Sequence, residues 1–199
     1  MTSLTQELID LVKTTLVDPR QAARTLLGRK LPKDTLWTAA LLVVIASTLL
    51  TYITLAPAAG PMPGWLSFAS SPFILALFMA ANIVIMIFAL FWTGKALGGQ
   101  GSLEGFIALM TWLQAMMVLI EIAQIILSLF SIALASLLGL AAIAWWVWAT
   151  VLFTTEGHQF DHWGKGVVAI GLAVLGMVAG LSLLLSLMGA GMMGVTGSV

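Results

Sequence analysis

Residues 106–155 read FIALMTWLQAMMVLIEIAQIILSLFSIALASLLGLAAIAWWVWATVLFTT, and Glu121 is the one charged side chain in this stretch. A single helix of that length would be about 75 Å long, whereas the hydrocarbon core of a bilayer is about 30 Å thick. The stretch therefore predicts two membrane spans, at about 106–128 and 137–155. The serines near its middle place the connecting turn near residues 129–136.

Three further apolar runs, at about 36–56, 73–93 and 165–188, have a length and composition typical of membrane spans. The chain is 61% hydrophobic and only 8% charged, against about 25% charged residues in a typical soluble domain. A core built from 199 residues could not bury so much apolar surface, so the solvent around it must be lipid. We therefore expect an all-α integral membrane protein with five transmembrane helices, forming one bundle over residues 36–188.

The positive charges all fall on one side of this arrangement. Six of the eight Lys and Arg residues precede the first span, Lys95 lies between the second and third, and Lys165 between the fourth and fifth. Membrane proteins keep Lys and Arg on the cytoplasmic side. The pattern predicts a cytoplasmic N-terminus and a short non-cytoplasmic tail at 189–199. Four spans would put Lys165 on the wrong side, and no apolar run is left to supply a sixth.

The first 35 residues are polar enough to stand apart from the bundle. Leucines and a valine recur at helical spacing in residues 4–17, and Asp18-Pro19 has the pattern of a helix cap followed by the first helical residue. We expect two amphipathic helices in residues 1–35. Two placements remain open: on the inner membrane surface, attracted by anionic lipid, or as a solvated cytoplasmic cap. The segment is too long and acidic for a signal peptide.

Glu121 is the most unusual residue within the spans. An ionisable group near the bilayer centre costs roughly 2.5–3.5 kcal/mol, so it usually faces protein or water. Gln114 and Gln124 share a helical stripe with it, and Asn82 of the second span comes at a similar depth. The four residues predict an intramembrane polar site, with Asn82 and Glu121 close enough to hydrogen-bond directly or through water. The site would be a proton- or ion-coupled one, or a polar contact that fixes helix packing. We favour packing, because the spans hold no second acid or base.

The segment EGHQFDH, at residues 156–162, contains residue types that bind metals. On a helix, His158, Asp161 and His162 would share one face. No matching half-site occurs elsewhere in the chain, so we expect a polar helix start at the head-group level, and neither a metal nor a cofactor.

The fifth span carries a GxxxG motif at Gly176 and Gly180, extended by Ala173 on nearly the same face. Small residues at this spacing let another helix approach closely. The motif fits packing within one chain and dimerisation equally well, so a homo-oligomer stays among the alternatives.

Other classes of function have little support in the composition. The formal net charge is zero, which argues against a nucleic-acid partner. There is no Cys, which excludes disulfides and thiolate chemistry. No serine has the context of a nucleophile, and GGQGS at 98–102 lacks the lysine and spacing of a phosphate-binding loop. We therefore expect a protein that is not an enzyme.

The layout as a whole resembles the bacterial branch of the Yip domain family. The resemblance rests on a polar N-terminal part with Leu-Val-Asp-Pro-Arg at residues 16–20, five spans, and a turn with Gly98-Gly99 and Gly101-Ser102 before the third span. Eukaryotic members of that family are five-span Golgi and ER proteins that interact with Rab/Ypt GTPases. Their Asp-Leu-Tyr-Gly-Pro motif is absent here, so Rab binding is assigned to no residue. The resemblance implies a bacterial inner-membrane protein.

Together these observations predict a membrane scaffold or partner-binding protein that acts in the lipid bilayer and meets a protein partner on the cytoplasmic side. The alternative is a small transporter or channel that uses the intramembrane polar layer around Glu121. A closed, packed polar stripe would favour the scaffold, and a water-filled cavity that reaches Glu121 would favour transport.

Overall fold

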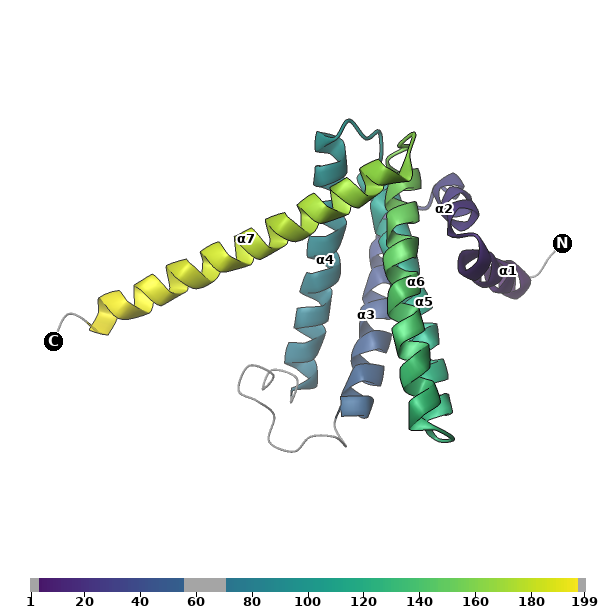
Figure 1. The fold of residues 1–199 in the computed structure, drawn as a ribbon, viewed down its shortest axis with the longest axis horizontal. Coiled ribbons are helices and arrows are strands. Elements are labelled where there is room, and N and C mark those ends of the chain that lie inside the picture. The colour runs from purple at the N-terminus through teal and green to yellow at the C-terminus, as the bar shows by residue number, and fades with distance from the viewer. Residues whose placement is uncertain (1–3, 56–70, 197–199) are drawn as a thin grey trace.

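A computed structural model describes residues 4–55 and 71–196, and every regular element in these two ranges is an α-helix. The helices, shown in Figure 1, are α1 (Leu4–Val17), α2 (Pro19–Gly28), α3 (Lys33–Leu55), α4 (Pro72–Ala96), α5 (Leu103–Ser128), α6 (Ile132–Gly157) and α7 (Trp163–Thr196). Within the described ranges, five helices, α3 to α7, are long and apolar enough to cross a membrane. The predicted all-α membrane class is confirmed.

Local sequence signals explain where the helices begin. Ser71, Ser102 and Ser131 stand immediately before α4, α5 and α6, and each side-chain oxygen accepts a hydrogen bond from a backbone N–H three residues later. Asp18 caps α2 in the same way and is followed by Pro19, whose missing N–H costs nothing at the first helical position. The turn between α5 and α6 occupies residues 129–131.

Helix α5 contributes more buried residues to the bundle core than any other helix. Its side chains from Phe106 to Leu113 pack against α3, α4 and α6, and Phe106, Leu109, Met110 and Leu113 are completely buried. The outer surfaces of α3, α4 and α6 carry exposed leucine and isoleucine side chains, which is the arrangement expected of helices in contact with lipid.

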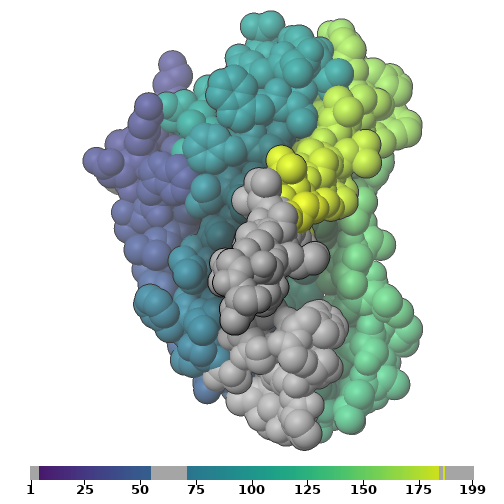
Figure 2. Space-filling view, turned by 90° about the vertical axis from the view of Figure 1, so that its left-hand side faces the viewer, coloured from purple at the N-terminus to yellow at the C-terminus, as the bar shows by residue number. Residues whose placement is uncertain are grey.

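Helix α7 leaves the other four long helices at a wide angle (Figure 1). Near its start, Ala169 and Ala173 are buried, and Gly166 lies against Thr155 of α6. Figure 2 shows the first part of α7, in yellow-green, between α4 in teal and α6 in green. From Val174 to Leu183 its larger side chains are mostly exposed. The helix continues to Thr196, beyond residue 188, where the fifth span was expected to end.

All the charged side chains except Glu121 belong to one end of the molecule. This end is formed by α1, α2, the start of α3, the end of α4, the start of α5, and the end of α6 with the turn into α7. In Figure 1 the end of α4 and the turn between α6 and α7 lie at the top, with α2 and then α1 lower on the right. We call this end of the molecule the charged end.

Candidate functional site

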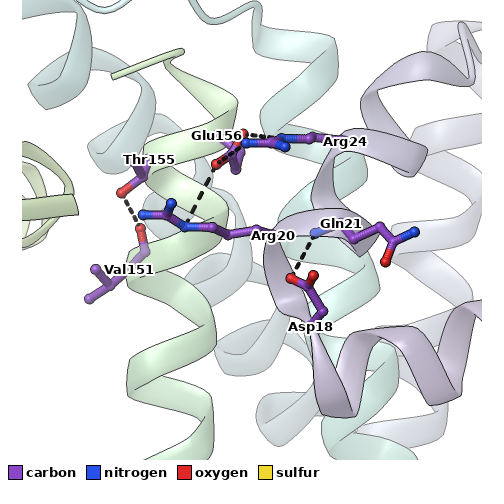
Figure 3. Close-up of polar contacts among 7 residues, drawn as sticks. All are labelled: Asp18, Arg20, Gln21, Arg24, Val151, Thr155 and Glu156. Atoms are coloured by element: carbon purple, nitrogen blue, oxygen red, sulfur yellow. Dashed lines mark hydrogen bonds and ion pairs between the residues drawn. The ribbon is translucent and has the colours of Figure 1, made fainter. Parts of the chain in front are cut away.

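A carboxylate clamp joins α2 to the last turn of α6 at the charged end. The guanidinium of Arg24 donates two hydrogen bonds to Glu156, from Nε to Oε2 at 2.8 Å and from Nη2 to Oε1 at 3.2 Å. Arg20 Nε lies 3.8 Å from Glu156 Oε1. Figure 3 shows both arginines reaching from α2 to this one carboxylate. The hydrogen bonds to Glu156 and its negative charge raise the pKa of Arg24 above its ordinary value, so the guanidinium stays charged.

The position of Glu156 explains why it needs two arginines. A carboxylate in the last turn of a helix faces the negative end of the helix dipole, which is unfavourable. The Glu156 side chain is also only 15% exposed, so it has lost much of its hydration. Two cations and a paired hydrogen-bond geometry offset both costs. Glu156 is therefore held as a docking point for α2.

Small residues allow α2 to lie close against the bundle. Ala22 and Ala23 are completely buried, and Pro19 and Leu26 are buried with them. A second ion pair lies nearby, where Lys33 Nζ at the start of α3 is 2.9 Å from Glu104 Oε1 at the start of α5. Helix α2 is thus a cap packed on the bundle, and its side chains Gln21, Arg24 and Thr25 remain on the outside.

His158, Asp161 and His162, which the sequence suggested as weak candidates for metal binding, do not share a helix face. Helix α6 ends at Gly157, and His158 is its cap. Gln159 has a left-handed backbone with φ of 57°, which turns the chain away from helical geometry. Asp161 and His162 follow on the surface. The prediction of one helical face was wrong, because the chain reverses direction at this point. Within the described ranges, no three His, Cys, Asp or Glu side chains lie in position to hold a metal.

His158 instead fills a pocket made by glycines at the charged end. A Cβ atom at Gly94 or Gly99 would collide with the imidazole ring, and one at Gly101 would come within 2.9 Å of it. Phe106 and Phe160 flank the ring, with centroids 4.4 and 5.2 Å from it. The glycine-rich loop between α4 and α5 is therefore wrapped around a buried side chain.

The hydrogen bonds of His158 connect three segments of the chain. Its Nε2 lies 3.1 Å from the carbonyl oxygen of Leu90 in α4, and its own carbonyl accepts a hydrogen bond from the Gln100 N–H at 2.9 Å. Nδ1 is buried and has no partner among the described residues. Burial lowers the pKa of His158, and the charge of Lys95 lowers it further, while the hydrogen bond to Leu90 opposes the shift. The ring is therefore neutral at pH 7, with Nε2 donating to Leu90.

The predicted polar layer divides into three separate contacts. Thr51 of α3 donates a hydrogen bond to Glu121 Oε1 at 3.3 Å, and Gln114 Nε2 donates to Ser47 Oγ at 3.4 Å. Gln124 Nε2 turns to α6 and donates to the carbonyl oxygen of Ala135 at 3.3 Å. The three side chains of α5 therefore bind two different helices.

Asn82 shares no hydrogen bond with Glu121, whose partner is Thr51. It lines one cavity of about 320 Å³ among α4, α6 and α7, and a second of about 240 Å³ among α3, α4 and α5. The second cavity also contacts Ser47 and Gln114. Glu121 lines neither of them.

The small residues of α7 differ in burial: some pack against the bundle and others are exposed. Ala173 is buried against the bundle, whereas Gly176 and Gly180 are exposed. A Cβ atom added at either glycine would meet nothing within 4 Å. The GxxxG motif is therefore not used for packing within the described part of this chain.

Five long apolar helices, with the charged side chains gathered at one end, define this chain as a multi-pass α-helical membrane protein. Comparison with protein families gives the family. The model of the Yip1 domain matches residues 13–198, which is nearly the whole chain, so the chain belongs to the Yip1 domain family. No curated protein and no solved structure matches it.

Proposed function

We propose that this protein is a non-enzymatic membrane scaffold of the Yip type that binds a protein partner through the outer surface of α2. The observation that carries the proposal is the clamp between Arg20, Arg24 and Glu156. It fixes an amphipathic helix to the end of the bundle by its apolar side. The polar side, with Gln21 and Thr25, is left facing outward on a rigid support.

Three side chains capable of acid–base chemistry at the charged end are engaged in structural contacts. Glu156 and Glu104 are held by basic residues, and His158 is enclosed by aromatic rings and glycines. Because these three side chains are already held by other residues, they favour a binding surface over a catalytic one.

We also propose that the charged end faces the cytoplasm of a bacterial cell, with the N-terminus inside and the C-terminus outside. All eight Lys and Arg residues of the sequence fall in segments at that end. Translocating them would be unfavourable, so this end is expected to stay on the side of synthesis. A soluble partner recognised through charge would then come from the cytoplasm.

A small transporter or channel is the second candidate function. It is favoured by Asn82, which lines cavities on both sides of α4 in the apolar part of the bundle. The contact between Thr51 and Glu121 argues against it, because the carboxylate is satisfied by a neighbouring helix and neither cavity reaches it.

Purification from native membrane after chemical cross-linking, together with a flux assay in liposomes, distinguishes the two functions. The scaffold predicts a specific co-purifying protein and no ion or solute flux above that of empty liposomes. Recovery of no partner, accompanied by flux that Asn82→Leu abolishes, would reverse the order of the two candidates. Gln21→Leu, on the outer surface of α2, should reduce recovery of the partner without affecting the liposome assay.

A further inference from the structure

Helix α1 has three distinct sides, and one of them is apolar and uncovered. Leu11 and Thr15 are buried against the rest of the protein. Leu8, Ile9 and Leu16 lie together on one flank at 3.6 residues per turn, and their side chains are 41%, 43% and 48% exposed. The opposite flank is polar apart from Val17, the last residue of the helix, which is 87% exposed. Gln6 and Thr14 lie there, and both donate hydrogen bonds to Asp10.

A hydrogen bond fixes where α1 lies along the length of the bundle. Trp112 Nε1 donates to Thr15 Oγ1 at 2.9 Å. Trp112 comes nine residues after the first residue of α5, or about 14 Å along its axis, and helical side chains point back toward the N-terminus. Thr15 therefore lies beside the upper turns of α5. Helix α1 is accordingly alongside the bundle, lower than α2 in Figure 1.

The surface next to α1 is one that lipid covers. Trp112, which holds Thr15, also lines an apolar groove of about 280 Å³ between α3 and α5. Leu42 and Leu119 line the same groove and are 61% and 47% exposed. Both helices are long and apolar enough to span a membrane. The uncovered flank of α1 is thus continuous with the hydrocarbon-facing surface of the bundle.

The charges of α1 indicate what kind of lipid contact this is. The helix carries Glu7 and Asp10 against a single base, Lys13. The neighbouring arginines are already paired: Arg20 and Arg24 of α2 with Glu156, and Arg29, which follows α2, with Glu7. Of the basic residues in residues 4–30, only Lys13 and Lys30 have no ion pair in the structure, so we expect burial of apolar area to provide most of the attraction.

We propose that α1 lies in the head-group and acyl-chain boundary of the leaflet at the charged end, with Leu8, Ile9 and Leu16 toward the acyl chains. The polar flank faces the head groups and water. The two N-terminal helices thus have different roles: α2 is packed on protein, and α1 is packed on lipid. This contact does not require anionic lipid.

The absence of Cys from the sequence permits a clean test with the full chain. Single cysteines are placed at Leu8 and Leu16 on the apolar flank and, as matched controls, at Gln6 and Thr14 on the polar flank. Each variant is spin-labelled and reconstituted in phosphatidylcholine vesicles, with and without phosphatidylglycerol. The accessibility of each label to oxygen, which concentrates in the bilayer, is compared with its accessibility to a water-soluble nickel chelate.

We expect the ratio of oxygen to nickel accessibility to be several-fold higher at Leu8 and Leu16 than at Gln6 and Thr14, in both kinds of vesicle. Equal ratios on the two flanks would overturn the proposal. Low accessibility to both reagents at Leu8 and Leu16 would also overturn it, because a protein would then cover this flank. A difference between flanks that arises only with phosphatidylglycerol would overturn the claim that apolar burial provides the attraction.

Discussion

Arg24 and Glu156 are 132 residues apart in the sequence and form a two-point hydrogen-bonded pair, with the shorter bond at 2.8 Å. The pair ties the polar N-terminal segment to the end of the fourth apolar helix. Because this pair joins α2 to α6, it holds α2 in one position at the charged end.

Loss of the Glu156 charge should release α2. Glu156→Gln keeps the shape of the side chain but removes the charge that holds two guanidinium groups, so α2 should detach more often. Limited trypsin digestion in detergent should then cleave after Arg20 and Arg24 several-fold faster than in the wild type. Asp161→Asn is the matched control, because the ion pair of Asp161 with Lys165 is fully on the surface. Equal cleavage rates in the two variants would contradict the clamp.

The glycine pocket should not tolerate an added methyl group. In Gly101→Ala the new Cβ would meet the carbonyl oxygen of Gly157 at 2.5 Å, and a backbone atom cannot move aside cheaply. We expect a loss of about 1–3 kcal/mol in the free energy of unfolding, as for other overpacked sites. Thermal or denaturant unfolding in detergent measures this. Gly171→Ala, where the methyl group meets nothing within 4 Å, should be neutral or stabilising. Similar losses in both variants would show that the pocket plays no part.

The buried imidazole should make stability depend on pH. Burial lowers the pKa of His158 in the folded state, so the unfolded state binds the proton more readily. Stability from this group is complete above the ordinary imidazole pKa of about 6.5 and falls as the pH decreases from there toward the lower folded-state value. Midpoints of thermal unfolding between pH 8 and pH 5 should show this decline. It should be absent in His158→Leu and retained in His162→Gln, since His162 is on the surface. Parallel curves for the wild type and His158→Leu would contradict the assignment.

The contact between Thr51 and Glu121 should behave as a packing contact. Hydrogen bonds between membrane helices contribute about 0.6 kcal/mol on average. A double-mutant cycle with Thr51→Val and Glu121→Leu, measured by unfolding in mixed micelles, should give a coupling free energy of about that size. Glu121→Gln, which keeps an acceptor for Thr51, should leave stability nearly unchanged. If the cycle gives no coupling and Glu121→Gln alters flux, the transport function gains the support that the scaffold loses.

The helical class was predictable from sequence because it depends on local patterns. Residues 106–155 are too long and too apolar for one helix, so two spans were expected, although α6 begins at Ile132 after its cap Ser131 and not near residue 137. The Asp18-Pro19 pair marks the start of α2 by its capping chemistry. These signals act within a few residues, so they are readable before the fold is known.

The contacts at the charged end were not predictable, because they join segments far apart in the chain. Nothing near Glu156 in the sequence indicates that Arg20 and Arg24 will reach it. The glycines at 94, 99 and 101 make room for His158, but the sequence shows only a glycine-rich loop. Residues 156–162 had metal-binding residue types at helical spacing, yet the left-handed backbone at Gln159 separates them.

The central claim is that the outer surface of α2 binds a protein partner while the clamp holds the helix in place. A photo-reactive amino acid at Thr25, on that surface, tests it most directly in native membranes. We predict a specific cross-linked protein that persists in Asp161→Asn and is strongly reduced in Glu156→Gln. The same probe at Leu140, on the exposed apolar side of α6, should not capture this protein. Equal cross-linking from Thr25 with and without the Glu156 charge, or capture of the same protein from Leu140, would contradict the account.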